Sequence, residues 1–376
     1  VFDPVGAAQR ARRALPGSVL LQVTRQAGGA SLTARSGSPV YYEVRLNADE
    51  AQYIRDNGLT TAAGQATCAQ LPGGLNLPHG ATGAPGVDPD LDCRGRPRTY
   101  GLDVGAMAVK AAWIVLPADH SLDARYLIAH ATVVDPATGA LRPATVGLVG
   151  LHVVRKLPGA AQYLWATFEH VDNAPDEAVA GAAAAATAPS ERSWTFFDPT
   201  CRPAADAAGC AHNIRPGVAC SSGGAATPGC RAAVAPVQVT RLTPLPPESA
   251  SADADAWAAI ERAQLPGASP STLRFYRLVD VQWPAQDVPP VPPRATVPLP
   301  ASNLIPTAAV RVVANTTMET FDQGQRSCID CHQAAAVARP GLTAQAAART
   351  LDAARVRSRL SGPVAAQARS PAYASD

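Results

Sequence analysis

Alternation of apolar and polar residues recurs along much of the chain and predicts β-strands. Successive side chains of a strand point to opposite faces, so a half-buried strand has a period of two. Eight segments carry this alternation or a β-branched run: 18–26, 39–47, 108–117, 124–135, 144–157, 162–171, 272–283 and 308–321. Turn-forming residues separate them. The pattern predicts a mainly β protein whose body is an antiparallel sandwich or barrel-like sheet, rather than alternating βαβ units.

Helical patterns are few and short. Residues 47–58 have Asn47 as a candidate N-cap and Glu50 three positions later, which is the spacing of a capping box. Residues 251–267 and 343–360 also favour helices, and each is followed or closed by Gly and Pro. We therefore expect a β body with only a few helices around it.

A proline-dense stretch divides the chain. Residues 283–306 should be an extended linker, because proline-rich sequence favours open, extended backbone. This gives three parts: a β-rich body with disulfide-stapled loops over 1–282, the linker, and a C-terminal segment over 307–376 with a helical tail. We expect the C-terminal segment to carry the cofactor described below.

Composition narrows the choice of partners. Apolar residues make up 47% of the chain, which is enough for a sizeable core. Lys and Arg number 32 against 30 Asp and Glu, so charge gives no reason to expect nucleic acid or an anionic membrane surface. The longest alanine-rich run, 177–191, is too short to span a bilayer and is bounded by carboxylates. We expect no membrane span.

Six of the eight cysteines lie in Gly- or Pro-rich stretches, a composition that is typical of loops. An even number of loop cysteines predicts disulfides in an oxidising compartment. Proximity favours three pairs: Cys68 with Cys93, Cys201 with Cys210, and Cys220 with Cys230. Free buried thiols or a zinc site are the alternatives. Since residue 1 is Val rather than an initiator Met, we expect a periplasmic or extracellular protein whose signal peptide has been removed.

The remaining two cysteines lie in the run Cys328-Ile329-Asp330-Cys331-His332. Two cysteines separated by two residues and followed by histidine are typical of covalent haem attachment. In that arrangement Cys328 and Cys331 bind the porphyrin and His332 is the proximal iron ligand. A redox dithiol would be expected early in a βαβ unit. A zinc site would need a second close ligand pair, which the sequence does not offer.

The second axial position of the iron has fewer candidates. Met318 is ten positions before Cys328, although a buried core methionine is the alternative. His170 follows Glu169 at the end of a predicted strand; it is either a distal ligand or a structural residue. If the site is open, His170 and Glu169 are the candidate distal acid and base. His152 lies in an apolar strand, where we expect a hydrogen-bonded core histidine.

The run "ANTTMETFDQGQRSCIDCHQAA", together with "GLVGLHVVRKL", "WATFEHVDNAPD" and "FFDPTC", resembles a group of bacterial exported c-type cytochromes. More distantly, the layout is similar to β-sheet cytochromes related to hydroxylamine-oxidising haem proteins. The resemblance implies one covalent haem c. We expect electron transfer with a redox partner protein or a small-molecule donor or acceptor. The alternative is a haem enzyme of peroxidase type, or one acting on small nitrogen oxides or oxygen.

Overall fold

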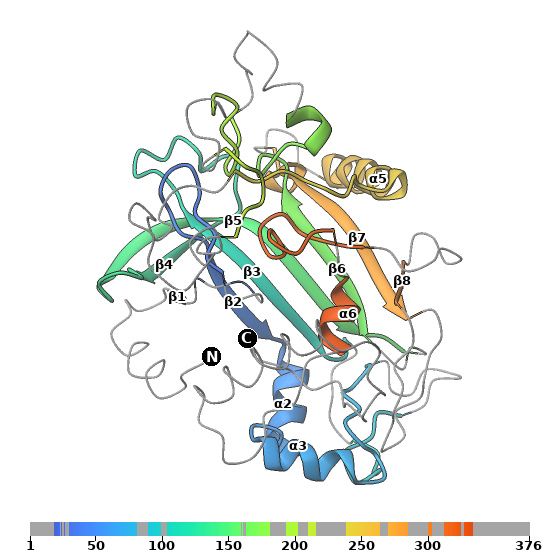
Figure 1. The fold of residues 1–376 in the computed structure, drawn as a ribbon. Helices are drawn as coiled ribbons and strands as arrows, with labels where there is room; N and C mark the ends of the chain where they lie inside the picture. Colours follow the sequence, from blue (N-terminus) through green and yellow to red (C-terminus); the bar gives the residue numbers. More distant parts are fainter. Residues whose placement is uncertain are drawn as a thin grey trace, which may run out of the picture.

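A computed structural model describes residues 19–22, 24, 26, 30–80, 89–98, 104–158, 160, 163–180, 193–201, 210–215, 238–263, 270–284, 300–302, 312–324 and 327–333. The fold is mainly β, with a nearly closed, barrel-like sheet (Figure 1). Its strands are β1 (Val19–Leu21), β2 (Tyr41–Leu46), β3 (Met107–Val115), β4 (Ile128–Val134), β5 (Leu141–Lys156), β6 (Tyr163–His170), β7 (Tyr276–Pro284) and β8 (Pro300–Ser302). The predicted fold class is thus confirmed in its coarse form.

Strand β5 organises the sheet because it is long enough to pair with three neighbours. One of its edges pairs with β3, and its other edge is shared by β4 along Leu141–Gly147 and by β6 along Gly150–Lys156. Between these two stretches the N–H of Leu148 donates to the carbonyl of Leu127 at 2.9 Å, and side chains bind other backbone groups. The Tyr276 hydroxyl donates to the carbonyl of Leu148 at 2.8 Å and accepts from the amide of Leu127 at 2.9 Å. Side chains therefore bridge the point where the two strands separate.

Local sequence explains the helices near the first strands. α2 (Ala48–Asp56) begins after Asn47, whose side chain accepts the N–H of Glu50, as the capping pattern predicted. Gly58, just beyond its end, has a φ of 67°, a conformation that glycine adopts without strain. α3 (Ala62–Ala69) was not predicted. It carries Cys68, so the expectation that this cysteine lies in a loop was wrong.

The later helices are α5 (Pro247–Ala263) and α6 (Cys328–Gln333), with a 3₁₀ turn, η1 (Thr272–Phe275), before β7. α5 starts earlier than predicted because Pro247 has a fixed φ suited to a first helical position. The helix expected over 343–360 lies outside the described residues. No helix in the described ranges has both the length and the apolar character needed to cross a membrane.

Two of the three expected disulfides are confirmed. Cys68 is bonded to Cys93, and Cys201 is bonded to Cys210. The expected Cys220–Cys230 pair lies outside the described residues. Each cross-link contributes roughly 2–4 kcal/mol by restricting the unfolded chain.

The strand predicted over 308–321 was wrong in its described part, because residues 312–315 have no regular structure and residues 316–324 form turns and a bend. Hydrogen bonds between Asn315 and the residues that follow it account for these turns. Its side-chain oxygen accepts the N–H of Thr317 at 3.0 Å, and its carbonyl accepts the N–H groups of Met318 and Glu319. Asn and Thr side chains compete with sheet pairing through such local bonds. We call residues 312–324 the buried segment, since most of its side chains are inaccessible.

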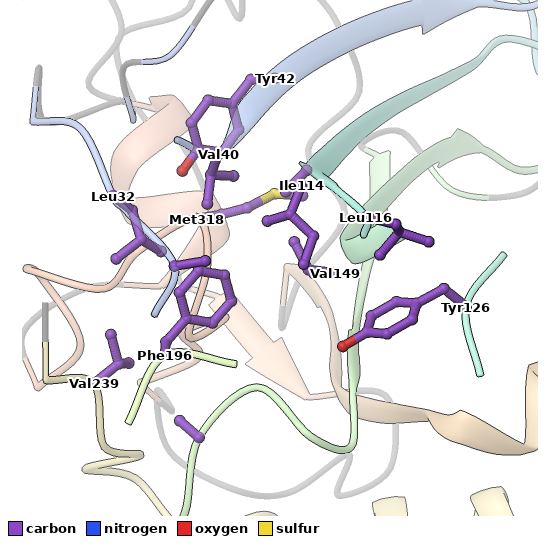
Figure 2. Packing of buried hydrophobic residues seen from close by; sticks show 13 residues of the cluster. Leu32, Val40, Tyr42, Ile114, Leu116, Tyr126, Val149, Phe196, Val239 and Met318 are labelled. Carbon is purple, nitrogen blue, oxygen red and sulfur yellow. The ribbon is translucent and has the colours of Figure 1, made fainter. Parts of the chain in front are cut away.

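The buried segment contributes directly to the main hydrophobic core. Met318, which is 1% exposed, belongs to the same cluster as Leu32, Val40, Ile114 and Phe196. Figure 2 shows its thioether between Tyr42, Val40 and Ile114. Over the described residues, β8 extends the sheet beside β7, and Met318 of the buried segment packs into the core formed with residues that precede it in the chain.

Candidate functional site

A row of polar side chains crosses one face of the sheet. Lys110 of β3 is in register with His152 of β5, His152 with Thr167 of β6, and Thr167 with Asp280 of β7. Residues in register share a face, so we call Lys110, His152, Thr167 and Asp280 the polar row. The buried segment and α6 lie over this face of the sheet, with α6 in front of β6 in Figure 1.

Glu169 holds the first part of the buried segment. One carboxylate oxygen accepts the N–H of Thr316 at 3.1 Å and its hydroxyl at 2.7 Å. The other oxygen pairs with the guanidinium groups of Arg277, at 2.7 Å, and Arg241. Burial alone would raise the pKa of Glu169, but the two arginines and the Thr316 hydroxyl lower it to about 2. Glu169 is therefore an ionised structural anchor.

Two further side chains hold the middle of the segment. The Gln26 amide donates to the carbonyl of Thr317 at 3.0 Å and to the hydroxyl of Thr320 at 2.7 Å. The Tyr42 hydroxyl donates to the same Thr317 carbonyl at 2.7 Å. Below it, a Cβ on Gly150 would stand 2.3 Å from the Thr317 hydroxyl oxygen. The segment thus lies so close to β5 that only glycine fits beneath it.

Helix α6 carries the cysteine and histidine motif onto this face. The N–H of Cys328 donates to the side-chain oxygen of Gln282 on β7 at 3.1 Å. Positions 328, 331 and 332 are spaced i, i+3 and i+4, so the motif residues share one side of the helix. The imidazole of His332 lies against Trp165 of β6, with ring centroids 4.2 Å apart and planes at 36°.

The His332 side chain is exposed in part, yet the surrounding sheet lowers its pKa to about 4. Desolvation against the sheet is the largest cause; His152 and Lys110 lower the pKa further, while Glu319 opposes the change. The ring contact of His332 is with Trp165, which lies on the same face of β6 as Thr167 of the polar row.

His152 and Glu319 form the central contact between the polar row and the buried segment. Nε2 of His152 lies 3.0 Å from Oε1 of Glu319, and Oε2 of Glu319 accepts the N–H of Asn315 at 2.9 Å. Burial raises the pKa of Glu319, but His152, the Asn315 N–H and Lys110 lower it below its ordinary value. Nδ1 of His152 is buried and has no hydrogen-bond partner among the described residues.

Sequence reasoning missed this arrangement. It placed His152 among core residues, whereas the side chain is 14% exposed and belongs to the polar row. The feature that identifies the polar position of His152 is its register with Lys110 on the neighbouring strand β3. This register is known only once the strands are paired.

Met318 and His170, the two expected candidates for the far side of the iron, are both enclosed elsewhere. Met318 is part of the hydrophobic core. His170 is 0% exposed and both ring nitrogens are engaged: Nε2 donates to the carbonyl of Arg125 at 2.9 Å, and Nδ1 accepts the N–H of Asp172 at 3.2 Å. Its ring stacks on Tyr126 with centroids 4.1 Å apart.

Burial lowers the pKa of His170 to about 4, although the hydrogen bond to Arg125 and the Asp172 charge oppose the change. His170 and Glu169 are adjacent on β6, so their side chains point to opposite faces of the sheet. The structure thus does not bring together the acid and base pair considered from the sequence.

A covalent haem, if present, would be held by positions 328, 331 and 332 of α6. The motif lies on one side of a helix, and a buried imidazole nitrogen without a hydrogen-bond partner belongs to the same polar face. Among the described residues, no group of three or more His, Cys, Asp and Glu side chains could hold a metal ion as a cage. Comparisons of the chain with protein-family models, curated proteins and solved structures found no match.

Proposed function

We propose that the chain is a c-type cytochrome with one covalent haem, and that it transfers electrons to or from a redox partner. The single observation that supports this is the position of the Cys328–His332 run on one helical turn against a sheet face. Its sequence has the spacing of a haem anchor. Its backbone has the helical form that lets residues i, i+3 and i+4 act on one ligand.

Haem supplies an iron that exchanges one electron when it is bound. Cys328 and Cys331 would hold the porphyrin by their thiols, each sulfur bonded to one carbon of a former vinyl group whose other carbon has gained the thiol proton. The imidazole of His332 would bind the iron. Trp165 limits the rotation of that ring through their contact at 4.2 Å.

Rigidity of the anchor favours electron transfer. Helix α6 begins four positions after Gly324, the last residue of the buried segment. That segment is held by Glu169, Gln26 and Tyr42 at the hydrogen-bond distances given above. A cofactor attached to α6, shortly after this held segment, would move little between oxidation states. An electron carrier requires that its structure change little between the oxidised and reduced states.

Two disulfides support an exported protein, since such bonds persist in oxidising compartments. We place the chain in the periplasm or outside the cell on this ground. The partner would be a redox protein or a small electron donor or acceptor.

The alternative of a haem enzyme has less support. The expected distal groups, His170 and Glu169, are committed to structural hydrogen bonds and ion pairs on opposite faces of β6. A general acid or base must reach its substrate with a proton to give or a free lone pair. Neither side chain meets that requirement in its described position.

Expression of the full chain together with the machinery for c-type haem maturation would test the proposal. We expect an intact mass increased by one haem that survives denaturation, and a reduced pyridine adduct typical of two thioether bonds. Replacement of Cys328 and Cys331 by Ser should abolish covalent retention. A matched control is the exposed histidine substitution His130→Gln on β4, which should retain full haem content. A colourless wild-type chain under these conditions would overturn the proposal.

A further inference from the structure

Two side chains on adjacent strands hold helix α6 at both of its ends. At the start, the N–H of Cys328 donates to the side-chain oxygen of Gln282 on β7 at 3.1 Å. In the last turn, the ring of His332 lies against Trp165 on β6, with ring centroids 4.2 Å apart. Trp165 and Gln282 are in register across the two strands, so they are neighbours on one face of the sheet. We call this pair the helix seat.

Contacts of this kind matter because α6 is short. It has six residues, and isolated helices of fewer than about 12 residues are marginal in water, so tertiary contacts decide where it lies. The first N–H groups of a helix have no partner within it, and Gln282 supplies one for Cys328. Gln282 is itself 0% exposed. The start of α6 is therefore held at a fixed point of β7.

Contact with Trp165 restrains the His332 ring without covering its nitrogens. The two ring planes meet at 36°, so the indole lies against a face of the imidazole, whereas both nitrogens are at the imidazole edge. The side chain of His332 is also exposed in part. A ligand can thus reach the ring edge while Trp165 remains against the ring face.

Trp165 is supported in turn along its own strand. Tyr163, two positions earlier on the same face of β6, contacts it edge to face, with ring centroids 6.3 Å apart and planes at 68°. An indole is a flat, rigid group with two side-chain torsions. Trp165 therefore presents His332 with a surface whose orientation is fixed by the sheet.

We propose that the helix seat positions the proximal ligand of the iron: Gln282 fixes the start of α6, and Trp165 fixes the plane of the His332 ring. This inference rests on the proposed function and deepens it, because it names the residues that act through His332. Both are positioning residues that would not touch the iron. Groups that orient a metal-binding histidine tune the metal through it, so the ring plane set by Trp165 would affect the electronic structure of the haem.

The test uses proton nuclear magnetic resonance of the ferric holoprotein with cyanide added. Cyanide fills the far side of the iron, so the paramagnetic shifts of the four haem methyl groups then depend on the plane of the proximal imidazole. Trp165→Leu removes the ring contact, and Trp165→Phe retains an aromatic face. The matched control is Trp113→Leu, which truncates a partly buried tryptophan of β3 that packs in another cluster.

We expect the same pattern of methyl shifts in the wild type and in Trp113→Leu. Trp165→Leu should show a narrower spread of shifts, because a ring free to rotate averages them, and Trp165→Phe should restore most of the spread. A pattern unchanged in Trp165→Leu would overturn the role of Trp165, as would an equal change in Trp113→Leu.

The wild type alone gives a second readout in case Trp165→Leu folds poorly. Dipolar contacts between the indole protons of Trp165 and the imidazole protons of His332 should be present in the holoprotein, and their absence would overturn the inference. For Gln282, the variant Gln282→Met keeps the side-chain volume but removes the acceptor. The amide hydrogen of Cys328 should then exchange faster than in the wild type, and an unchanged rate would exclude Gln282 from the seat.

Failure of this inference is distinguishable from failure of the proposed function. A wild-type chain that binds haem covalently but lacks the contact between Trp165 and His332 remains a c-type cytochrome whose proximal ligand is positioned by other groups. A wild-type chain that retains no haem overturns both.

Discussion

The carboxylate of Glu169 and the guanidinium of Arg241 form an ion pair in which the side chains are 0% and 1% exposed. Arg277 adds a second cation at 2.7 Å, and Thr316 of the buried segment donates two hydrogen bonds to the same carboxylate. Charges removed from water in this way depend on their partners, because each has lost its hydration. This cluster connects β6 and β7 to the segment that leads into α6.

We therefore predict that Glu169→Gln is strongly destabilising. It leaves the buried Arg241 with only the more distant carboxylate of Asp176, 3.9 Å from Nε. Removing the close partner of a buried ion pair typically costs about 3–5 kcal/mol. Urea unfolding at neutral pH would measure the loss. The control is Glu43→Gln, which removes the partner of Arg45, a side chain that is 58% exposed; this should cost less than about 1 kcal/mol. Equal losses in the two variants would contradict the anchoring role of Glu169.

The buried imidazole of His170 predicts a pH dependence. Its pKa is lowered from 6.5 to about 4 in the folded protein, so the unfolded chain binds the proton more readily. The free energy of unfolding is then highest above pH ~6.5 and falls as the pH drops toward 4, by up to roughly 3 kcal/mol from this group.

Other groups titrate over the same range, so the prediction concerns a difference between proteins. Relative to the wild type, His170→Gln should lose less stability between pH 6.5 and 4, because glutamine does not titrate. Thermal unfolding across this range measures both curves. His130→Gln, at an exposed position, should follow the wild type. If the stability of His170→Gln and of the wild type fell equally between pH 6.5 and 4, the titration of His170 would not contribute to the pH dependence.

Gly150 should tolerate no side chain. An added Cβ would lie 2.3 Å from the Thr317 hydroxyl and 3.0 Å from the Asn315 side-chain oxygen, and these two groups are bonded to each other at 2.8 Å. Gly150→Ala must displace the buried segment, at a cost of roughly 1–3 kcal/mol. Hydrogen exchange should report faster exchange of the Thr316 and Thr317 amides.

Gly324 provides the matched control at the end of the same segment. An added Cβ there meets nothing within 4 Å. Gly324→Ala should stay within about 0.5 kcal/mol of the wild type, the range of ordinary surface changes. Comparable effects at both glycines would show that the close approach to β5 has little energetic importance.

The two disulfides should differ in their contribution to stability. Cys68–Cys93 spans 25 positions and Cys201–Cys210 spans 9. A longer closed loop restricts the unfolded chain more, so the double change of Cys68 and Cys93 to Ala should cost more than the same change at Cys201 and Cys210. Chemical denaturation of both variants, with thiol counts to verify the bonds, would measure this. A larger loss at the shorter loop would point to packing rather than chain restriction.

Local features were predictable wherever a few neighbouring residues decide the conformation. The side-chain period of two identified seven strands, and the Asn47 cap identified the start of α2. The same logic failed at residues 312–321. Their apolar and β-branched residues suggested a strand, but Asn315 closes turns and the surrounding body supplies partners for their backbone.

The sequence alone determined which residues could perform chemistry. The order Cys328, Cys331 and His332 predicts covalent haem attachment, because thioether formation and iron ligation require those groups at that spacing. Only the tertiary structure decided which side chains surround the motif. It placed Met318 in the core, engaged both nitrogens of His170, and brought Glu319 to His152 across 167 positions. Alternation tells which residues share a face of a strand, but pairing register and long-range packing determine what covers that face.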